Sequence, residues 1–240
     1  MTRRVYVGVS GFSYPSWRGK FYPEATKSEG FLPYYSQHLR SVEINSSFYA
    51  QPGTATVRNW SGTTGEDFKF AFKAPRQITH ISKLGKGSAE VATRFSSILD
   101  LLGPKRGPIL FQLPPYVKQD LERLEQFLTD TSGIVDRVFE FRHASWFQGP
   151  TYRLLDRHTA GFCIVDSEDL TTEFQVTGES AYFRLRKESY DARTIDQWAE
   201  RIRGLTKGAR ESYVYLRHDE TGENAVLAQR LSEKLDPEKG

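Results

Sequence analysis

The chain has 240 residues, of which 38% are hydrophobic, so it can bury a full core and has the length of one barrel domain. Its 33 basic and 30 acidic residues leave a net charge of +3, without the strong basic excess of a dedicated nucleic-acid-binding protein. Cys163 is the only cysteine, which excludes a disulfide framework or a zinc finger and indicates a reducing, cytoplasmic compartment. No run approaches about 18 apolar residues, so we expect no membrane span.

The first strand is predicted over residues 5–9, and a loop rich in aromatic and turn residues follows it over residues 10–19. The glycines here lack the spacing of a dinucleotide-binding fingerprint. Tyr14 and Trp17 in this loop could stack on a sugar or a base, or they could plug the top of the core.

Residues 31–40 carry apolar side chains at helical spacing and predict the first outer helix. The second strand, residues 41–49, places Glu43 and Asn45 on one face, because successive side chains of a strand point to opposite faces. It therefore delivers a carboxylate and an amide to the same side of the sheet.

A second helix is predicted over residues 54–62 and a third strand over residues 68–74, near the end of which Lys73 lies. Lys73 could bind an anionic substrate, or act as a base or Schiff-base nucleophile if its pKa is lowered. The alternative is an ion pair with Glu43 or Glu140.

The most regular helical pattern covers residues 88–102, with Ser88 as the predicted N-cap. The fourth strand, residues 108–113, delivers Gln112 before two prolines. An amide has no acid-base chemistry, so Gln112 is expected to orient a substrate or a carboxylate through hydrogen bonds.

The fifth strand, residues 137–142, carries Glu140 and Arg142 on one face of an otherwise apolar run. Opposite charges on a buried strand are costly to desolvate unless they pair with each other or serve a ligand. His143 follows directly and could act with Glu140 as acid and base, or simply cap a backbone carbonyl. Both alternatives stay open for each residue.

A fifth helix is predicted over residues 150–158 and a sixth strand over residues 162–166, which ends in Asp166. The alternating residues 171–178 predict a small extra strand. The seventh and eighth strands end in arginines, namely Arg184, Arg186 and Arg217. Phosphate groups in barrels commonly bind beyond these two strands.

Each predicted strand is apolar for most of its length and polar at its carboxyl end, and helices alternate with the strands. This organisation is typical of an α/β fold, the TIM (β/α)8 barrel, whose active sites lie at the carboxyl ends of the strands. We therefore predict a single barrel domain over residues 1–240.

Several unusual motifs resemble the family known as domain of unknown function 72, over nearly the whole chain. They are Gly8-Val9-Ser10-Gly11-Phe12-Ser13-Tyr14, Trp17-Arg18-Gly19, Phe21-Tyr22-Pro23, Val42-Glu43-Ile44-Asn45-Ser46-Ser47-Phe48-Tyr49, Phe111-Gln112-Leu113-Pro114-Pro115 and Glu140-Phe141-Arg142-His143. The resemblance implies a TIM barrel and leaves the chemistry to the residues themselves.

Two positions depart from the family pattern. Arg186 stands where relatives typically have a histidine, and Arg217-His218-Asp219 stands where they usually have two asparagines. A glutamate, an aspartate and a histidine on strands five to seven would resemble the metal site of barrel sugar isomerases and endonucleases. Without that histidine, Glu140 and Asp166 form an incomplete ligand set, so a divalent metal stays an open question.

These residues together predict an enzyme that acts on a small anionic substrate, a phosphorylated sugar or a nucleotide-like molecule, by acid-base or metal-assisted chemistry. The candidate catalytic residues are Glu43, Lys73, Glu140, His143 and Asp166. The candidate substrate-binding residues are Tyr14, Trp17, Asn45, Gln112, Arg142, Arg184, Arg186 and Arg217. The alternatives are a nucleic-acid or nucleotide-binding module without catalysis, a glycosidase, and a scaffold whose polar strand ends satisfy one another. The oligomeric state is not predicted.

Overall fold

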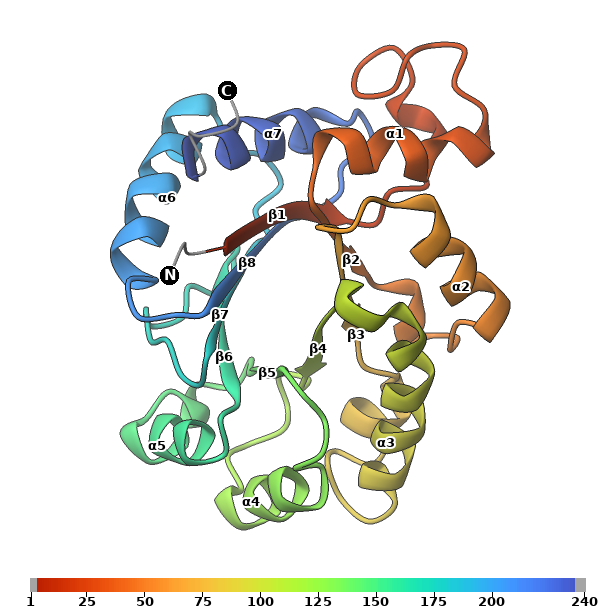
Figure 1. Ribbon diagram of the computed structural model, residues 1–240. Coiled ribbons are helices and arrows are strands. Elements are labelled where there is room, and N and C mark those ends of the chain that lie inside the picture. Colours follow the sequence, from red (N-terminus) through yellow and green to blue (C-terminus); the bar gives the residue numbers. More distant parts are fainter. Residues whose placement is uncertain (1–3, 236–240) are drawn as a thin grey trace.

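Eight parallel strands pair in sequence order and close into a barrel in this computed structural model, which describes residues 4–235. The first strand, β1, pairs with β2 on one side and with β8 on the other, as Figure 1 shows. The strands are β1 (Arg4–Ser10), β2 (Ser41–Ile44), β3 (Lys69–Lys73), β4 (Arg106–Gln112), β5 (Arg137–Glu140), β6 (Gly161–Asp166), β7 (Ser180–Leu185) and β8 (Glu211–Leu216). The predicted TIM barrel is confirmed.

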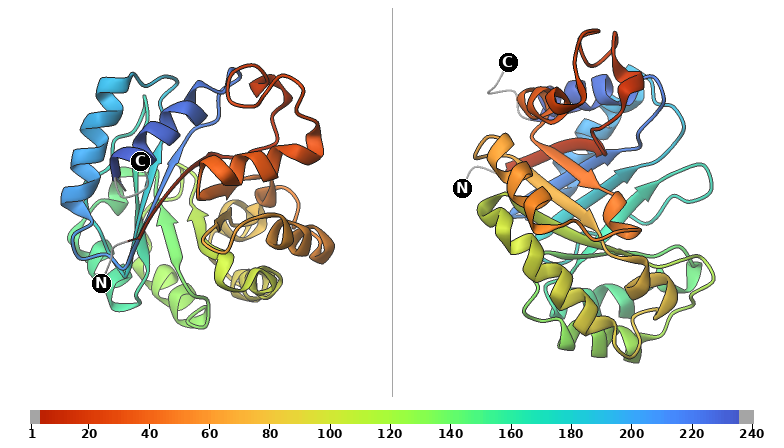
Figure 2. Two further views of the ribbon diagram at one scale, coloured as in Figure 1. Left: turned by 45° about the horizontal axis from the view of Figure 1, so that its top comes forward. Right: turned by 90° about the vertical axis from the view of Figure 1, so that its right-hand side faces the viewer.

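Helices surround the barrel, and the two views of Figure 2 show them on its outer side. They are α1 (Phe31–His38), α2 (Thr54–Thr63), α3 (Ser88–Leu99), α4 (Leu121–Asp130), α5 (Gly149–Arg157), α6 (Ala192–Leu205) and α7 (Glu223–Leu235). The larger hydrophobic core lies between these helices and the outward-facing side chains of the strands. This arrangement leaves the inward-facing side chains to fill the barrel itself.

The extra strand predicted over residues 171–178 is wrong. Only Thr171 forms a bridge, to Asp166, and the rest of the segment is a loop between β6 and β7. Thr177 donates to the carbonyl of Ala160 at 2.8 Å, and the Gly178 amide donates to Asp156 at 2.9 Å. Because β6 and β7 already pair with each other, the alternating segment has no free sheet edge to join.

Other predicted boundaries also shift. The second strand ends at Ile44 instead of residue 49, because Asn45 has helical dihedral angles (φ −88°, ψ −21°) and a 3₁₀ turn, Ser46–Phe48, follows it. Ser88 is not the N-cap of α3. Gly87 takes that position with a φ of +80°, a left-handed conformation that glycine adopts readily.

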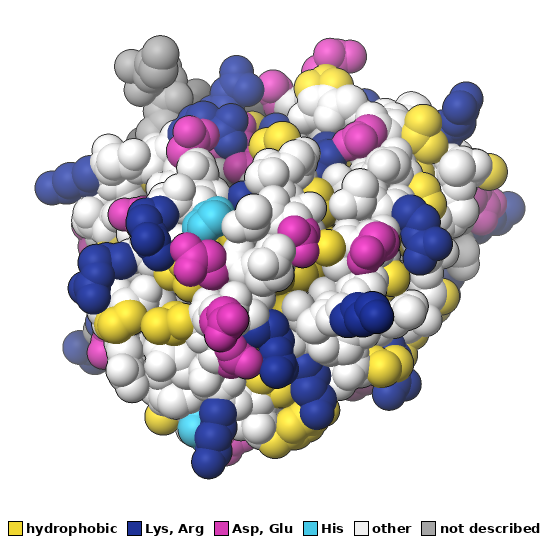
Figure 3. All heavy atoms as spheres, turned by 90° about the horizontal axis from the view of Figure 1, so that it is seen from below, with side chains coloured by type: hydrophobic (Ala, Val, Ile, Leu, Met, Phe, Trp, Pro, Cys, Tyr) yellow, Lys and Arg dark blue, Asp and Glu magenta, His cyan; other side chains and the backbone are white. Residues whose placement is uncertain are grey.

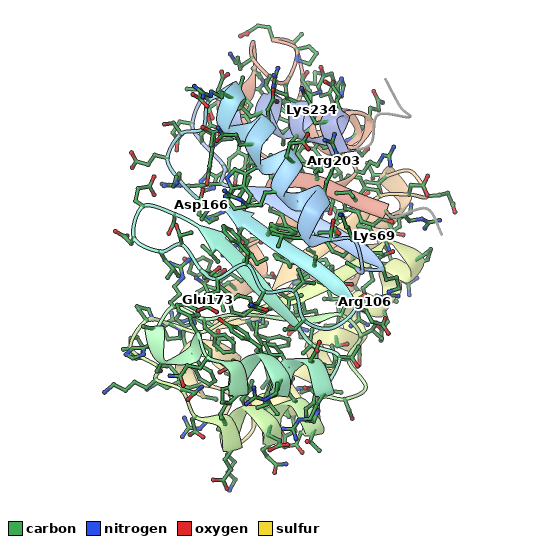
Figure 4. All side chains as sticks on the ribbon, turned by 90° about the vertical axis from the view of Figure 1, so that its left-hand side faces the viewer. Lys69, Arg106, Asp166, Glu173, Arg203 and Lys234 are labelled. Atoms are coloured by element: carbon green, nitrogen blue, oxygen red, sulfur yellow. The ribbon has the colours of Figure 1, made fainter. Side chains whose placement is uncertain are left out.

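The barrel interior also holds a cluster of aromatic and aliphatic side chains, including Tyr6, Tyr182, Tyr213 and Tyr215. At the amino-terminal end, Lys69 lies 3.7 Å from Glu211. Figure 4 shows Lys69 and Asp166 near opposite ends of the barrel. The charged residues predicted for the site therefore belong to the carboxyl end.

On the outer surface, positive and negative side chains are interspersed over the face where α4 and α5 lie (Figure 3). A mixed surface of this kind fits the nearly balanced composition of the whole chain. Among residues 4–235, none of the helices combines the length and the apolar character that crossing a membrane requires.

Candidate functional site

Nine polar side chains gather at the carboxyl-terminal mouth of the barrel, and we call them the mouth cluster. Strand register brings some of them level, since Ser10 pairs with Glu43 and Gln112 with Glu140. The members are Ser10, Glu43, Asn45, Lys73, Gln112, Glu140, Arg142, Arg184 and Arg186. They come from six strands and the residues just beyond them, as an active site of this fold requires.

Arg184 of β7 is the centre of the mouth cluster and is only 2% exposed. Its Nε and Nη2 atoms lie 2.9 and 3.0 Å from the two carboxylate oxygens of Glu43. Its Nη1 atom donates to Glu140 Oε2 at 2.5 Å. Burial opposes the charge on Arg184, but the two carboxylates outweigh it and raise its pKa well above the ordinary value. Arg184, predicted to bind substrate, is thus held between two strands of the barrel wall.

Glu43 is fully buried and accepts hydrogen bonds from neutral groups as well as from Arg184. Tyr182 donates to its Oε1 atom at 2.9 Å, and Ser10 and Asn45 donate to Oε2 at 2.8 and 3.0 Å. Burial alone would raise the pKa of Glu43, but Arg184 and then Arg186 lower it below the ordinary value. Both carboxylate oxygens of Glu43 therefore accept hydrogen bonds.

Glu140 is held in the same way at the end of β5. Gln112 donates to Oε1 at 2.9 Å, and Arg142 Nε donates to the same oxygen at 2.8 Å, which confirms the ion pair on one face of the strand. Burial opposes ionisation, but Arg184 and Arg142 outweigh it and lower the pKa of Glu140 to about 2. A carboxylate of this pKa is a weak base at neutral pH.

The side-chain amine of Lys73 makes neither an ion pair nor a hydrogen bond with the residues that the structure describes. Its Nζ atom instead lies 4.2 Å from the centre of the Phe48 ring. The predicted pairing with Glu43 or Glu140 is therefore not found. Burial, and then the positive charge of Arg184, lowers the pKa of Lys73 to about 8. An amine of this kind loses its proton within the range in which enzymes work.

Arg186 also lacks a carboxylate partner within residues 4–235. Its Nη1 atom donates to the Ser10 hydroxyl at 2.7 Å. Burial, and then the charge of Arg184, lowers the pKa of Arg186 to about 10. Arg217 follows β8, and the structure shows no side-chain hydrogen bond or ion pair for it among the described residues.

Asp166 is not brought together with Glu43 and Glu140, which corrects the predicted grouping. Its side chain accepts from Tyr190 at 3.1 Å and lies 3.0 Å from Lys187, in the loop beyond β7. The inward-facing positions of β6 are odd-numbered, as Cys163 and Val165 show, so an even-numbered residue faces the helices.

His143 caps a short turn. Its Nδ1 atom accepts from the Ser145 amide at 3.2 Å and lies 2.9 Å from the Ser145 hydroxyl. The predicted cap was on a carbonyl, whereas His143 accepts from an amide, and the acid-base role stays a prediction. A different histidine, His80, packs on Phe48 beside Lys73, and burial followed by the charge of Lys73 lowers its pKa.

The loop aromatics are committed to packing, contrary to their predicted role in substrate binding. Trp17 is fully buried, packs at a tilt against Tyr14 and donates through Nε1 to the Asp219 carbonyl at 2.7 Å. Tyr14 donates to the Ser10 carbonyl at 2.8 Å and stacks on His218 at 4.9 Å. Of the two readings of this loop, the structure supports the plug over the core.

Two members of the hydrogen-bond network were not predicted. Tyr182 and Ser10 both donate to Glu43. Their positions carried a signal, because Tyr182 shares the inward face of β7 with Arg184 and Ser10 ends β1. Neither residue type marks a site by itself.

The donor set does not fit a metal centre. Arginines and amides take up the oxygens of Glu43 and Glu140, and Asp166 lies on the other side of the strand wall. Within the described part of the chain, no group of three or more histidine, cysteine, aspartate and glutamate side chains is placed to hold a metal ion.

The model of the family described as "Protein of unknown function DUF72" matches residues 6–240. The chain belongs to the DUF72 family. UPF0759 protein YecE of Escherichia coli K12 is 30% identical over 155 residues, which are 64% of this chain and 54% of YecE. YunF of Bacillus subtilis 168 is also 30% identical over 155 residues, covering 62% of this chain and 54% of YunF. The chain thus spans about half the length of these curated relatives.

Solved structures agree with this assignment. A DUF72 protein from Thermotoga maritima has a TM-score of 0.82 and 28% identity, with 98% of this chain and 100% of that chain covered. A D-psicose 3-epimerase from Clostridium cellulolyticum H10 has a TM-score of 0.58 at 10% identity, with 98% of both chains covered. The second likeness shows only that the two proteins share the barrel fold.

Proposed function

We propose that this DUF72 protein is an enzyme that binds a small anionic substrate at the mouth of the barrel and uses Lys73 to move a proton. Four cationic side chains of the mouth cluster face two carboxylates, a surplus of two positive charges. Buried charge of one sign is unfavourable unless an opposite charge completes it. The single observation that carries the proposal is that, among the described residues, the side chains of Lys73 and Arg186 have no carboxylate partner, although Arg184 beside them binds two.

The carboxylates have a positioning role in this proposal. Glu43 and Glu140 fix the guanidinium groups of Arg184 and Arg142, and their low pKa keeps them ionised at neutral pH. Arg142 is one third exposed and Arg186 is partly exposed, and these two arginines offer N–H groups that would clamp a phosphate or carboxylate.

Lys73 is the proton-transfer group because its pKa of about 8 is the mouth-cluster value nearest to neutrality. The neutral amine would accept a proton from the bound substrate, and the resulting ammonium would return it. A phosphorylated sugar and a nucleotide-like molecule both fit this chemistry. A nucleic-acid-binding role is less well supported, since Tyr14 and Trp17 are engaged in packing.

The test uses inorganic phosphate as the probe and the thermal midpoint as the measurement. Phosphate is expected to raise the midpoint of the native protein, because a ligand that binds only the folded state stabilises it. The effect should be lost in Arg186→Gln and reduced in Lys73→Met. Lys69→Met is the matched control, since this lysine lies on the same strand at the opposite end of the barrel.

Turnover is then sought by incubating the native protein with an extract of anionic metabolites and following their conversion by mass spectrometry. Conversion should disappear in Lys73→Met and persist in Lys69→Met. Equal phosphate stabilisation in all variants would overturn the anion site. Native turnover in a folded Lys73→Met would overturn the role of the lysine.

A further inference from the structure

Two acceptors of the mouth cluster have no hydrogen-bond partner among residues 4–235. They are the side-chain carbonyl oxygens of Asn45 and Gln112, and both atoms are buried. Buried polar atoms of native proteins are nearly always paired, with protein, water or a ligand. Each of the two amides also lies beside a buried carboxylate, Asn45 beside Glu43 and Gln112 beside Glu140.

Their orientation is fixed by those carboxylates. Asn45 donates through Nδ2 to Glu43 Oε2 at 3.0 Å, and Gln112 donates through Nε2 to Glu140 Oε1 at 2.9 Å. An ionised carboxylate only accepts hydrogen bonds, so a flipped amide would bring two acceptors together. The carbonyl oxygens are therefore held as acceptors that face away from Glu43 and Glu140.

The two acceptors lie on either side of Lys73. Asn45 directly follows β2, the strand on one side of β3. Gln112 ends β4, the strand on the other side of β3. Both amides therefore belong to the strands that flank the one carrying Lys73.

Unpaired donors and unpaired acceptors thus occur together in one site. The donors are on Lys73, Arg142 and Arg186, and none of them bonds to Asn45 or Gln112. A carboxylate, or a phosphate monoester in its dianionic form, offers acceptors alone and would satisfy only the cationic side chains. Hydroxyl groups supply the missing donors, since each carries one O–H.

We propose that the substrate is a polyhydroxylated anion, a sugar phosphate or a sugar acid, whose hydroxyl groups donate to Asn45 and Gln112 while its anionic group binds the arginines. This inference rests on the proposed function and specifies its substrate class. It also assigns Asn45 and Gln112 as specificity residues. A hydroxyl bound between them lies beside Lys73, where its carbon or oxygen can exchange a proton with the amine.

The test measures binding by titration calorimetry with matched probes. Ribose 5-phosphate carries the anion and hydroxyl groups, and methyl phosphate carries the anion alone. The native protein is expected to prefer ribose 5-phosphate by about tenfold or more. Gluconate against butyrate repeats the comparison for carboxylates and shows whether a sugar phosphate or a sugar acid is the better ligand.

Gln112→Met and Asn45→Leu each remove one acceptor from a different strand. Each variant should lose most of the preference for ribose 5-phosphate while its affinity for methyl phosphate stays within about threefold. Gln126→Met is the control, since this glutamine is exposed on α4 and bonds only to Asp130. Circular dichroism and the thermal midpoint check that each variant is folded.

The outcomes separate the two proposals. Equal binding of the hydroxylated and plain anions by the native protein would overturn the role of the amides and leave the anion site intact. An unchanged preference in both folded variants would do the same. Failure of every anion to bind would instead overturn the proposed function itself.

Discussion

Arg184 donates to Glu140 at 2.5 Å from β7 to β5, and the same guanidinium binds Glu43 on β2. All three side chains are buried, so one cation joins three strands that are not neighbours in the barrel. The ring of strands is therefore tied across its interior as well as along its hydrogen-bonded wall.

Replacing Arg184 by Met should destabilise the protein by about 3–5 kcal/mol, because two buried carboxylates lose their common partner. Urea unfolding followed by circular dichroism measures the free energy of unfolding. Arg230→Met is the control, since Arg230 pairs with Asp196 on the surface and should matter far less. Equal losses in the two variants would contradict the central role of Arg184.

Acid should weaken the fold through Glu140. The pKa of this group is about 2 in the folded chain, below its ordinary value of 4.5, so the unfolded chain binds the proton first as the pH falls. Its stabilising effect is complete above pH 4.5 and is lost progressively towards pH 2. Unfolding measured at pH 7, 4.5 and 3 should show the native protein losing more stability than Glu140→Gln below about pH 4.5. A constant difference between them would argue against the lowered pKa.

The pKa of Lys73 is lowered to about 8 from the ordinary lysine value of 10.5, so this amine should titrate near pH 8. The pH dependence of its acetylation by acetic anhydride, followed by peptide mass spectrometry, reports this pKa. Saturating phosphate should raise it, because a bound anion favours the ammonium form. Lys69, which lies near Glu211, serves as the internal reference. Acetylation of Lys73 that follows an ordinary lysine profile, with or without phosphate, would count against the proposal.

Trp17→Ala should destabilise the protein by about 3–5 kcal/mol, because a fully buried indole leaves a large cavity. The affinity for ribose 5-phosphate should be unchanged, since Trp17 packs under the mouth and does not line it. Tyr49→Ala controls for loss of an aromatic ring, as Tyr49 is 79% exposed. A stable variant with weakened binding would restore the stacking role.

The period of two along a strand predicted most of the mouth cluster. It correctly placed Glu43 with Asn45 and Glu140 with Arg142, because in each pair an apolar residue separates two polar ones. The same rule could not predict whether Asp166 faces the barrel interior. The residues before it are apolar on both faces of β6, so the pattern does not distinguish the inward face from the outward face.

Contacts across the barrel interior could not be predicted from the sequence. Whether Arg184 binds a ligand or two carboxylates depends on strand register and on which side chains reach across the interior, and neither leaves a local pattern. The same holds for Trp17, whose partner Asp219 is 202 positions away. Local periodicity describes one strand at a time, whereas these contacts join several.

The bond between Trp17 and the Asp219 carbonyl also bears on the order in which the chain can fold. Together with the pairing of β1 and β8, it joins the first and last strands. During synthesis, β1 keeps one unpaired edge until β8 has left the ribosome, and exposed strand edges invite aggregation. The pairing of β1 with β8 joins residues that are far apart in the sequence, and contacts of this kind form slowly. A nascent chain halted before β8 would therefore be a natural client for chaperones.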